Sequence, residues 1–211
     1  MNFYENRILP RIIDKICGHR GFAAQRARLI PRAKGRVLEV GYGTGTSLPW
    51  YEPAQVESLV ALDPAEGAMA LAAGREKDVE FPVEHVGLRG EEIPLDPSSI
   101  DTVVVAYTLC TIPDVVAALA QMRRVVKPDG QLLFMEHGLA TSGSMQRWQE
   151  RMNPAWGVLF GGCDLTRRPN DLVKRAGFNL ELDESFKIEH VPPIPGIALV
   201  RFNYLGVARP A

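Results

Sequence analysis

Val37-Leu38-Glu39-Val40-Gly41-Tyr42-Gly43-Thr44-Gly45 joins a short apolar run directly to three glycines at alternate positions. The run is typical of a strand, and Thr46-Ser47-Leu48 after it resembles a helix start that Pro49-Trp50-Tyr51 interrupts. Glycine is required where a backbone leaves a strand and bends sharply, because a side chain would hold the main chain away from a ligand. The stretch therefore predicts a nucleotide-binding turn.

The spacing of the glycines discriminates between classes of nucleotide. A dinucleotide-binding G-x-G-x-x-G needs a third glycine, but that position holds Thr46 counted from Gly41 and Leu48 counted from Gly43. A phosphate-binding P-loop needs lysine after its glycines, and the next lysine is Lys77. NAD and the nucleoside triphosphates are therefore disfavoured.

A second acidic residue lies one strand further along. Asp63 ends the apolar run 59–62, 22 residues after Gly41, and this separation suits a βαβ unit whose second strand offers a carboxylate to ribose hydroxyls. Together with Glu39, the pattern E-x-G-x-G-x-G resembles the class I S-adenosylmethionine (SAM) methyltransferases. The resemblance implies that the glycine turn faces the methionine end of SAM and that Asp63 binds the ribose.

The rest of the chain alternates strand and helix patterns. We expect helices over 4–17, 22–30, 65–75, 114–126, 144–156 and 170–176, and further strands over 81–86, 99–106, 131–136, 178–188 and 197–207. Lys127 to Gly130 reads as a turn, and Pro154 should bend or end its helix. These patterns and the resemblance predict an α/β fold, a Rossmann-like seven-stranded, mostly parallel sheet with helices on both faces and an antiparallel last strand.

Composition limits the class of protein. The 211 residues, 46% hydrophobic and 23% charged, suit one globular domain over 1–211, with a helical cap over 1–34 and a SAM-binding core over 35–211. The N-terminus lacks the apolar core of a signal peptide, so we expect a cytoplasmic protein. Three widely spaced cysteines, Cys17, Cys110 and Cys163, support neither a disulfide framework nor a metal site, and we expect no metal.

Charge is unevenly distributed although the formal net charge is −1. Before Val37 stand nine lysines and arginines but only Glu5 and Asp14 as acids. This basic segment is either a solvated helical face, the interpretation we favour, or a peripheral contact with anionic lipid. It lacks interleaved aromatic residues, so we expect no nucleic-acid partner. Phe3 and Tyr4 are candidates to line a pocket.

The resemblance and the strand order also assign site residues. Ligands of open α/β sheets lie beyond the carboxyl ends of the strands, so Tyr107, Thr108, Leu109 and Cys110 should border the transferred methyl group. In the resembled family an acidic side chain of the loop after the third strand contacts adenine, which here points to Glu91. The expected cofactor contacts are Glu39, Gly41, Tyr42, Gly43, Gly45, Thr46, Asp63, Pro64, Gly90, Glu91, Tyr107 and Thr108.

The second half of the chain carries a narrower resemblance. Glu136-His137, Asn153-Pro154-Ala155-Trp156, the segment 162–167 and Arg175-Ala176-Gly177-Phe178 are similar to the methyltransferase-like thiol S-methyltransferases. The resemblance implies a small thiol acceptor and makes His137, Asp164 and Cys110 the catalytic candidates, with Cys163 lining the pocket. Arg167 either binds an acidic substrate group or pairs with Glu136 or Asp164. The animal members begin with a hydrophobic membrane segment, which this N-terminus lacks.

Two other functions are compatible with the sequence. The stretch 39–49 also resembles phospholipid N-methyltransferases, which would use the basic N-terminal helix at a membrane surface. A SAM-binding module without catalysis is the alternative from another class. The sequence leaves the methyl acceptor and the oligomeric state unassigned, because acceptors are selected by the shape of a pocket.

Overall fold

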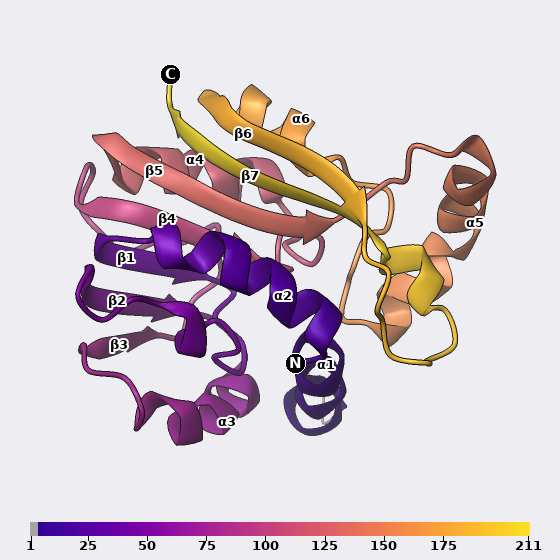
Figure 1. Cartoon of the computed structure of the whole chain (residues 1–211), viewed down its shortest axis with the longest axis horizontal. Helices are drawn as coiled ribbons and strands as arrows, with labels where there is room; N and C mark the ends of the chain where they lie inside the picture. Colours follow the sequence, from indigo (N-terminus) through magenta and orange to yellow (C-terminus); the bar gives the residue numbers. More distant parts are fainter. Residues whose placement is uncertain (1–3) are drawn as a thin grey trace.

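The computed structural model describes residues 4–211, and a single mixed sheet forms its centre (Figure 1). The strand order is β3-β2-β1-β4-β5-β7-β6. The strands are β1 (Gly35–Val40), β2 (Val56–Leu62), β3 (Val83–Val86), β4 (Ile100–Ala106), β5 (Val126–His137), β6 (Phe178–Lys187) and β7 (Phe202–Pro210). β7 runs antiparallel to both of its neighbours, and the pairs among β1 to β5 are parallel. The expected seven-stranded Rossmann-like sheet with an antiparallel last strand is confirmed.

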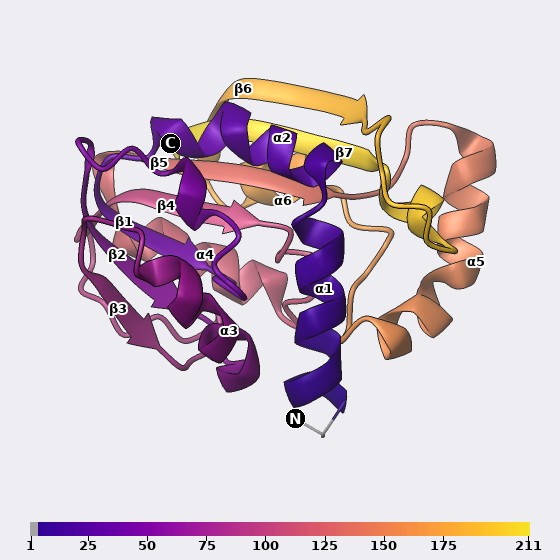
Figure 2. The same cartoon turned by 60° about the horizontal axis from the view of Figure 1, so that its bottom comes forward.

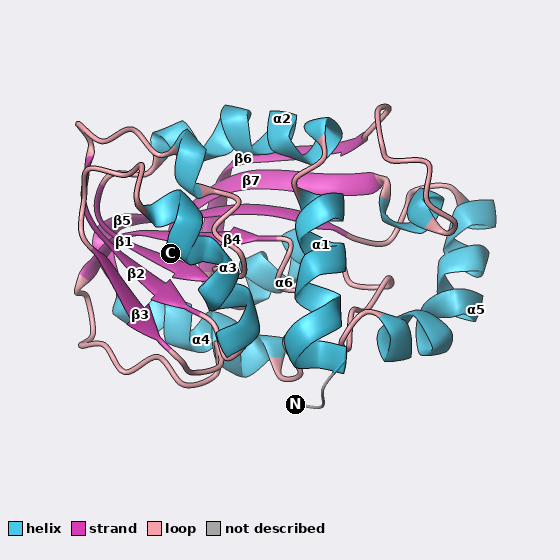
Figure 3. Cartoon of the chain, turned by 90° about the horizontal axis from the view of Figure 1, so that it is seen from below, coloured by secondary structure: helices cyan, strands magenta, loops and turns pink. Residues whose placement is uncertain are grey.

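Helices cover both faces of this sheet (Figure 3). They are α1 (Leu9–Cys17), α2 (Arg20–Leu29), α3 (Glu66–Glu76), α4 (Val115–Val125), α5 (Gly143–Leu159) and α6 (Pro169–Arg175). Four short helices, η1 (Tyr4–Ile8), η2 (Ile30–Arg32), η3 (Leu48–Trp50) and η4 (Ile197–Val200), complete the set among the described residues. α1 stands at the carboxyl ends of the central strands, and α5 lies beyond the sheet (Figure 2).

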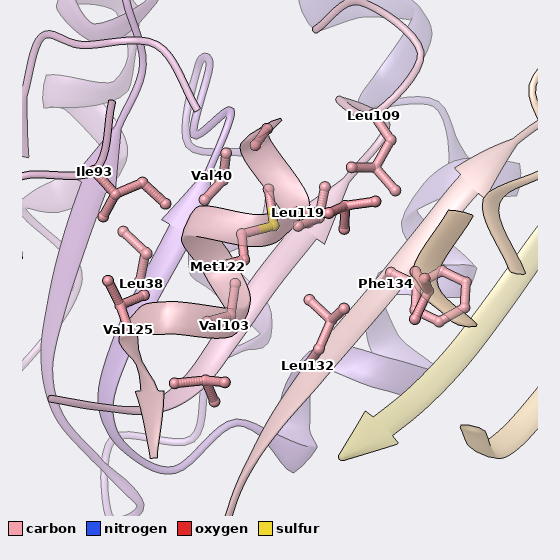
Figure 4. Packing of buried hydrophobic residues seen from close by; sticks show 14 of the residues in the cluster. Leu38, Val40, Ile93, Val103, Leu109, Leu119, Met122, Val125, Leu132 and Phe134 are labelled. Carbon is pink, nitrogen blue, oxygen red and sulfur yellow. The ribbon is translucent and has the colours of Figure 1, made fainter. Parts of the chain in front are cut away.

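The alternation of side chains along each strand divides the core into two layers. Val37 of β1 packs in the layer that contains Leu29 of α2 and Ala72 of α3. Leu38 points to the opposite face, where it belongs to the cluster of α4 residues Leu119, Met122 and Val125 (Figure 4). Neighbouring strand residues face opposite sides of a sheet, so the apolar run of β1 is buried on both faces.

One local expectation around the strands is confirmed and one is wrong. The helix start after the glycines is interrupted as expected: it forms only the single 3₁₀ turn η3, and Tyr51 already has an extended backbone. The turn expected at 127–130 is instead part of β5, which starts at Val126 and is irregular where it first pairs with β4. Proline and glycine there mark the irregularity in the strand.

Two further boundaries differ from the expectation. α5 continues through Pro154 to Leu159, so the proline does not end it. The preceding turn is exposed at Glu150 and Arg151, where water can satisfy the carbonyl that proline leaves unbonded. The last strand begins at Phe202, and residues 197–200 form η4. The last strand pairs with β6 from Phe202 and with β5 from Asn203, opposite His137, where β5 ends.

None of the helices in the described part of the chain is both long and apolar enough to cross a bilayer.

Candidate active site

A cavity of about 480 Å³ opens at the carboxyl ends of β1, β2, β4 and β5, beneath α1. A ligand pocket usually measures about 300–1,000 Å³, so this one is large enough for a nucleoside and an acceptor. A smaller cavity of about 120 Å³ adjoins it on the β2 side. Both cavities are lined by Gly41, Asp63, Arg89, Thr108, Thr111 and Pro113.

The glycine turn bends sharply, as expected, and its three glycines have left-handed backbone conformations. Gly41, Gly43 and Gly45 have φ values of +75°, +58° and +71°. A Cβ on Gly41 would lie 2.1 Å from the Thr108 side chain, whose hydroxyl donates to the Gly41 carbonyl at 3.3 Å. A Cβ on Gly43 would meet only one atom within 4 Å, the Gly41 carbonyl oxygen at 3.8 Å. The turn therefore packs tightly against the end of β4 at Gly41 and exposes its backbone at Gly43.

Asp63 stands at the exit of β2 and lines both cavities. Its two carboxylate oxygens accept backbone N–H bonds from Gly43 and Ala65, each at 2.8 Å. Burial raises the pKa of Asp63 despite these two bonds. Each oxygen keeps a second lone pair, so the carboxylate can bind a ligand hydroxyl while it holds the glycine turn.

The smaller cavity brings together three more of the predicted cofactor residues, Pro64, Gly90 and Glu91. Glu91 Oε1 accepts the backbone N–H of Asp114 at 3.2 Å. Its other oxygen, Oε2, is buried and has no hydrogen-bond partner within residues 4–211. A buried acceptor without a partner is a site for a ligand donor, such as an exocyclic amino group.

Two predicted cofactor residues line neither cavity. Glu39 lies on the α2 side of β1, because strand residues alternate, and its Oε2 accepts the Tyr51 hydroxyl at 2.9 Å. Burial raises the pKa of Glu39 to about 7. Gly45 packs against Leu48 and Tyr42 below the turn. Glu39 and Gly45 therefore support the glycine turn on the side away from the cavity. Tyr42 and Thr46 line the larger cavity.

At the inner end of the larger cavity lie His137, Cys110 and Cys163, all buried. The Nε2 of His137 is 3.1 Å from Cys163 Sγ, and the indole N–H of Trp156 donates to the same sulfur at 3.3 Å. The three ligand atoms all lie within 4.8 Å of one another. The fold therefore joins two predicted catalytic residues to a cysteine that we expected only to line the pocket.

The pKa values of Cys110, His137 and Cys163 shift in different directions. Hydrogen bonds from Cys110, His137 and Trp156 lower the pKa of Cys163 to about 4, against the opposing effect of burial. The same contact with Cys163, together with burial, raises the pKa of Cys110. Burial alone would lower the pKa of His137, but the charge of Cys163 raises it above its usual value.

Asp164, the third predicted catalytic residue, lines neither cavity. Its Oδ1 accepts the N–H and hydroxyl of Thr166 at 2.8 and 2.7 Å, and its Oδ2 lies 3.5 Å from Arg167 Nε. Arg167 also donates to the Leu109 carbonyl. Of the roles considered for Arg167, the pairing with Asp164 is confirmed, and the two residues fix the loop that carries Cys163.

The N-terminal helices complete the walls of the cavity. Arg26 is 2% exposed, lies 5.2 Å from the Tyr107 ring centroid, and donates to the Cys17 carbonyl at 2.7 Å. We did not predict Arg26, although its position four residues after Phe22 placed it on the apolar face of α2. Tyr107 itself has a φ of +59° and a buried hydroxyl that lacks a partner in the described structure.

Of the two aromatic residues expected near the N-terminus, Phe3 lies outside the described residues. Tyr4 does not line the cavity, and its hydroxyl donates to the Leu159 carbonyl of α5 at 2.7 Å.

Comparison with known proteins shows the family to which the chain is similar. A family model described as a methyltransferase domain matches residues 38–134. Human thiol S-methyltransferase TMT1A is 30% identical over 181 residues, which cover 84% of this chain and 72% of that protein. Phosphatidylethanolamine N-methyltransferase of Cereibacter sphaeroides is 30% identical over 115 residues, 53% of this chain and 55% of that protein.

Solved structures share the fold. A geranyl diphosphate methyltransferase in complex with SAM has a TM-score of 0.71 at 13% identity, covering 90% of this chain and 85% of that chain. A second structure is the complex between the Haloferax volcanii Trm112 methyltransferase activator and a methyltransferase. Its TM-score is 0.70 at 17% identity, and the match covers 96% of this chain and 94% of that chain.

Proposed function

The chain belongs to the family of SAM-dependent methyltransferases that includes the thiol S-methyltransferases, and from this premise we propose that its methyl acceptor is a small thiol. The observation that carries the proposal is the chemistry of the inner end of the cavity. The side chains gathered there are sulfur, imidazole and aromatic groups: Cys110, Cys163, His137, Trp156 and Phe160. A thiol matches such a wall better than a charged or strongly hydrated acceptor.

The order of the strand ends supports a linear arrangement of ligands. The strands β2, β1, β4 and β5 are successive neighbours in the sheet. Asp63, Gly41 and Thr108 follow the first three of these strands, and His137 ends β5. With the ribose at Asp63 and the adenine beside Glu91, the sulfonium points past Gly41 and Thr108. The acceptor then enters between β4 and β5, beside His137.

Sulfur also suits an apolar site on energetic grounds. A thiol has a pKa of about 8.5, so a few per cent is thiolate at neutral pH without strong base catalysis. The thiolate charge cancels the sulfonium charge as the methyl group transfers, and such a reaction benefits from a site that excludes water. The apolar side chains of α1 that line the cavity, Leu9, Ile13 and Ile16, serve this exclusion.

Matched acceptors test the proposal. The full-length protein is incubated with methyl-labelled SAM and either thiophenol or phenol, and S-adenosylhomocysteine (SAH) release is followed. We expect turnover with the thiol, at least about tenfold faster than with its oxygen analogue. SAH binding without turnover of any thiol, in a panel that includes hydrogen sulfide and alkyl thiols, would contradict the proposal.

A second candidate acceptor is the amino headgroup of a phospholipid. The similarity to a phosphatidylethanolamine N-methyltransferase favours it, and so does the outer face of α1, where Ile12 is 38% exposed between the exposed cations Arg11 and Lys15. Methylation of phosphatidylethanolamine in vesicles that also contain an anionic lipid, at a rate that falls with added salt, supports this candidate. Thiol turnover without lipid, and none with vesicles, rules it out.

A further inference from the structure

The three side chains at the inner end of the cavity come from distant parts of the chain. Cys110 follows β4, His137 ends β5, and Cys163 lies in the loop after α5. Their spacings in sequence, 27 and 26 residues, match no metal-binding motif. The fold nevertheless places two sulfurs and an imidazole nitrogen within 4.8 Å of one another, all buried and all lining the cavity.

We propose that Cys110, His137 and Cys163 bind a zinc ion whose fourth coordination position opens into the cavity. Two cysteines and one histidine form a donor set that zinc prefers, and three protein ligands with one open position are typical of a catalytic zinc site. With zinc–ligand bonds of about 2.0–2.3 Å, ligand atoms stand about 3.5–3.8 Å apart. The observed separations require only small side-chain adjustments to reach this geometry.

The backbone already holds the three donors in place. Asp164 N–H donates to the Cys110 carbonyl at 2.9 Å, which joins the two cysteine loops directly. The Glu136 carboxylate accepts the N–H groups of Thr108 and Leu109 at 2.6 and 2.9 Å, and so fixes the cysteine turn beside His137. Pre-organised ligands of this kind bind a metal without the cost of ordering loops.

Other polar groups surround the three proposed zinc ligands. The Trp156 indole N–H on Cys163 Sγ is an outer contact of the kind that orients a metal-bound thiolate. The other ring nitrogen of His137, Nδ1, is buried and has no partner among the described atoms. Nε2 is the nitrogen that faces Cys163 Sγ, so the zinc would bind Nε2, and an ordered water at Nδ1 would supply the outer hydrogen bond that metal-bound imidazoles usually make.

Charge balance favours the same ion. Zinc with two thiolates and a neutral imidazole carries no net charge, and a neutral complex avoids the large cost of burying an isolated charge. A third thiolate in the open position would make the complex singly negative. The positively charged sulfonium of SAM, bound as proposed at the ends of β1 and β4, would neutralise it.

The catalytic role of the zinc extends the proposed function and rests on it. A thiol that enters the open position loses its proton to bulk water, because a metal-coordinated thiol is deprotonated. Its sulfur then attacks the methyl carbon of SAM, a new carbon–sulfur bond forms, and the sulfonium–methyl bond breaks. The products are a neutral thioether and SAH, which are weaker ligands for zinc than the thiolate and leave the site open.

Metal content and cobalt spectroscopy test the site independently of activity. The full-length protein, purified under reducing conditions without chelators, should contain about one zinc per chain. Replacing the zinc by cobalt should give the visible bands of a tetrahedral ion and a sulfur-to-cobalt charge-transfer band. Adding thiophenol should shift the visible bands, whereas phenol should not.

Single cysteine variants identify the ligands. Cys110→Ser and Cys163→Ser should lower zinc affinity by at least about tenfold and weaken the sulfur-to-cobalt band. Cys17→Ser is the matched control, since Cys17 also lines the cavity but lies outside the cluster, and its metal content should equal that of the parent protein.

The possible failures are distinguishable. A reduced protein that contains no zinc and binds no cobalt overturns the site, and thiol turnover by this metal-free protein leaves the proposed acceptor standing. A Cys110–Cys163 disulfide that persists under reducing conditions also overturns it. A zinc-loaded protein that methylates no thiol supports the site and contradicts the proposed function.

Discussion

Asp63 combines two tasks in one side chain. Its carboxylate holds the glycine turn through Gly43 and the start of the next helix through Ala65, and it also lines both cavities. Because the same oxygens fix the loop and face the ligand, the geometry of the turn and the affinity for the nucleoside should depend on the same charge.

Replacing Asp63 by asparagine should therefore weaken cofactor binding strongly. Hydrogen bonds to a charged group contribute about 1.5–3 kcal/mol, which corresponds to about a 10- to 150-fold increase in the Kd for SAH. Calorimetric titration measures this change. Asp78→Asn, at an exposed turn, is the control and should bind SAH like the parent protein. Unchanged affinity of the Asp63 variant would remove Asp63 from the site.

Gly41 shows how little space the turn has. An alanine Cβ would meet Thr108 at 2.1 Å, and the φ of +75° is unfavourable for any side chain. We expect Gly41→Ala to lower the free energy of unfolding by about 1–3 kcal/mol. Gly74→Ala in α3, where a Cβ meets nothing within 4 Å, should raise it by about 0.5–1 kcal/mol. Urea unfolding separates the two, and equal effects would contradict the packing described for the turn.

At the scale of elements, a group of polar contacts holds α1 over the cavity. Asp14 of α1 accepts the Thr44 hydroxyl at 2.6 Å and Arg75 Nη1 at 2.9 Å. Arg75, from α3, also donates to the Thr44 carbonyl at 2.7 Å. Burial opposes ionisation, but the bonds from Arg75 and Thr44 keep the pKa of Asp14 below its usual value. The contact links α1, the glycine turn and α3.

Asp14→Ala should weaken the contact that holds α1 over the cavity. The part-exposed contact contributes about 1 kcal/mol, so we expect about a fivefold increase in the Kd for SAH and faster dissociation. Limited proteolysis should cut α1 more readily in the variant. Lys15→Ala, on the exposed face of the same helix, controls for helix propensity and should change neither measurement. A variant that releases SAH at the parent rate would show that α1 does not depend on Asp14.

At the scale of the whole molecule, buried carboxyls make stability depend on pH. Burial raises the pKa of both Glu39 and Glu136 to about 7. A carboxyl with a raised pKa in the folded protein binds its proton more tightly there than in the unfolded chain. Its contribution to stability is complete below about pH 4.5 and is lost as the pH rises through about 7.

Glu39→Gln isolates one of these groups. Glutamine resembles the protonated carboxyl, so the variant and the parent should have similar free energies of unfolding near pH 5. At pH 8 the variant should be more stable than the parent by about 2–3 kcal/mol. Glu57→Gln, exposed on β2, should follow the parent at every pH. A constant difference between Glu39→Gln and the parent would mean that Glu39 does not titrate in this range.

The sequence by itself determined the features that one short segment encodes. The glycine turn, the strand before it and Asp63 after the next strand could be identified because each depends on local backbone and on a fixed repeat of strand and helix. One error lies where proline and glycine have two local meanings. Lys127 to Gly130 became an irregular strand because neighbours in space decided between a turn and a strand. Of the two effects expected of Pro154, the end of the helix does not occur.

Only the tertiary structure decided which side chains meet. Alternation along β1 turned Glu39 away from the cavity, and α1 brought Asp14 onto the glycine turn. The parallel sheet aligned the ends of β4 and β5, so that Cys110, His137 and Cys163 converge although no spacing in the sequence relates them. Sequence patterns indicate the secondary structure of a residue and whether it is buried. Contacts between strand ends depend instead on the order in which the strands pair.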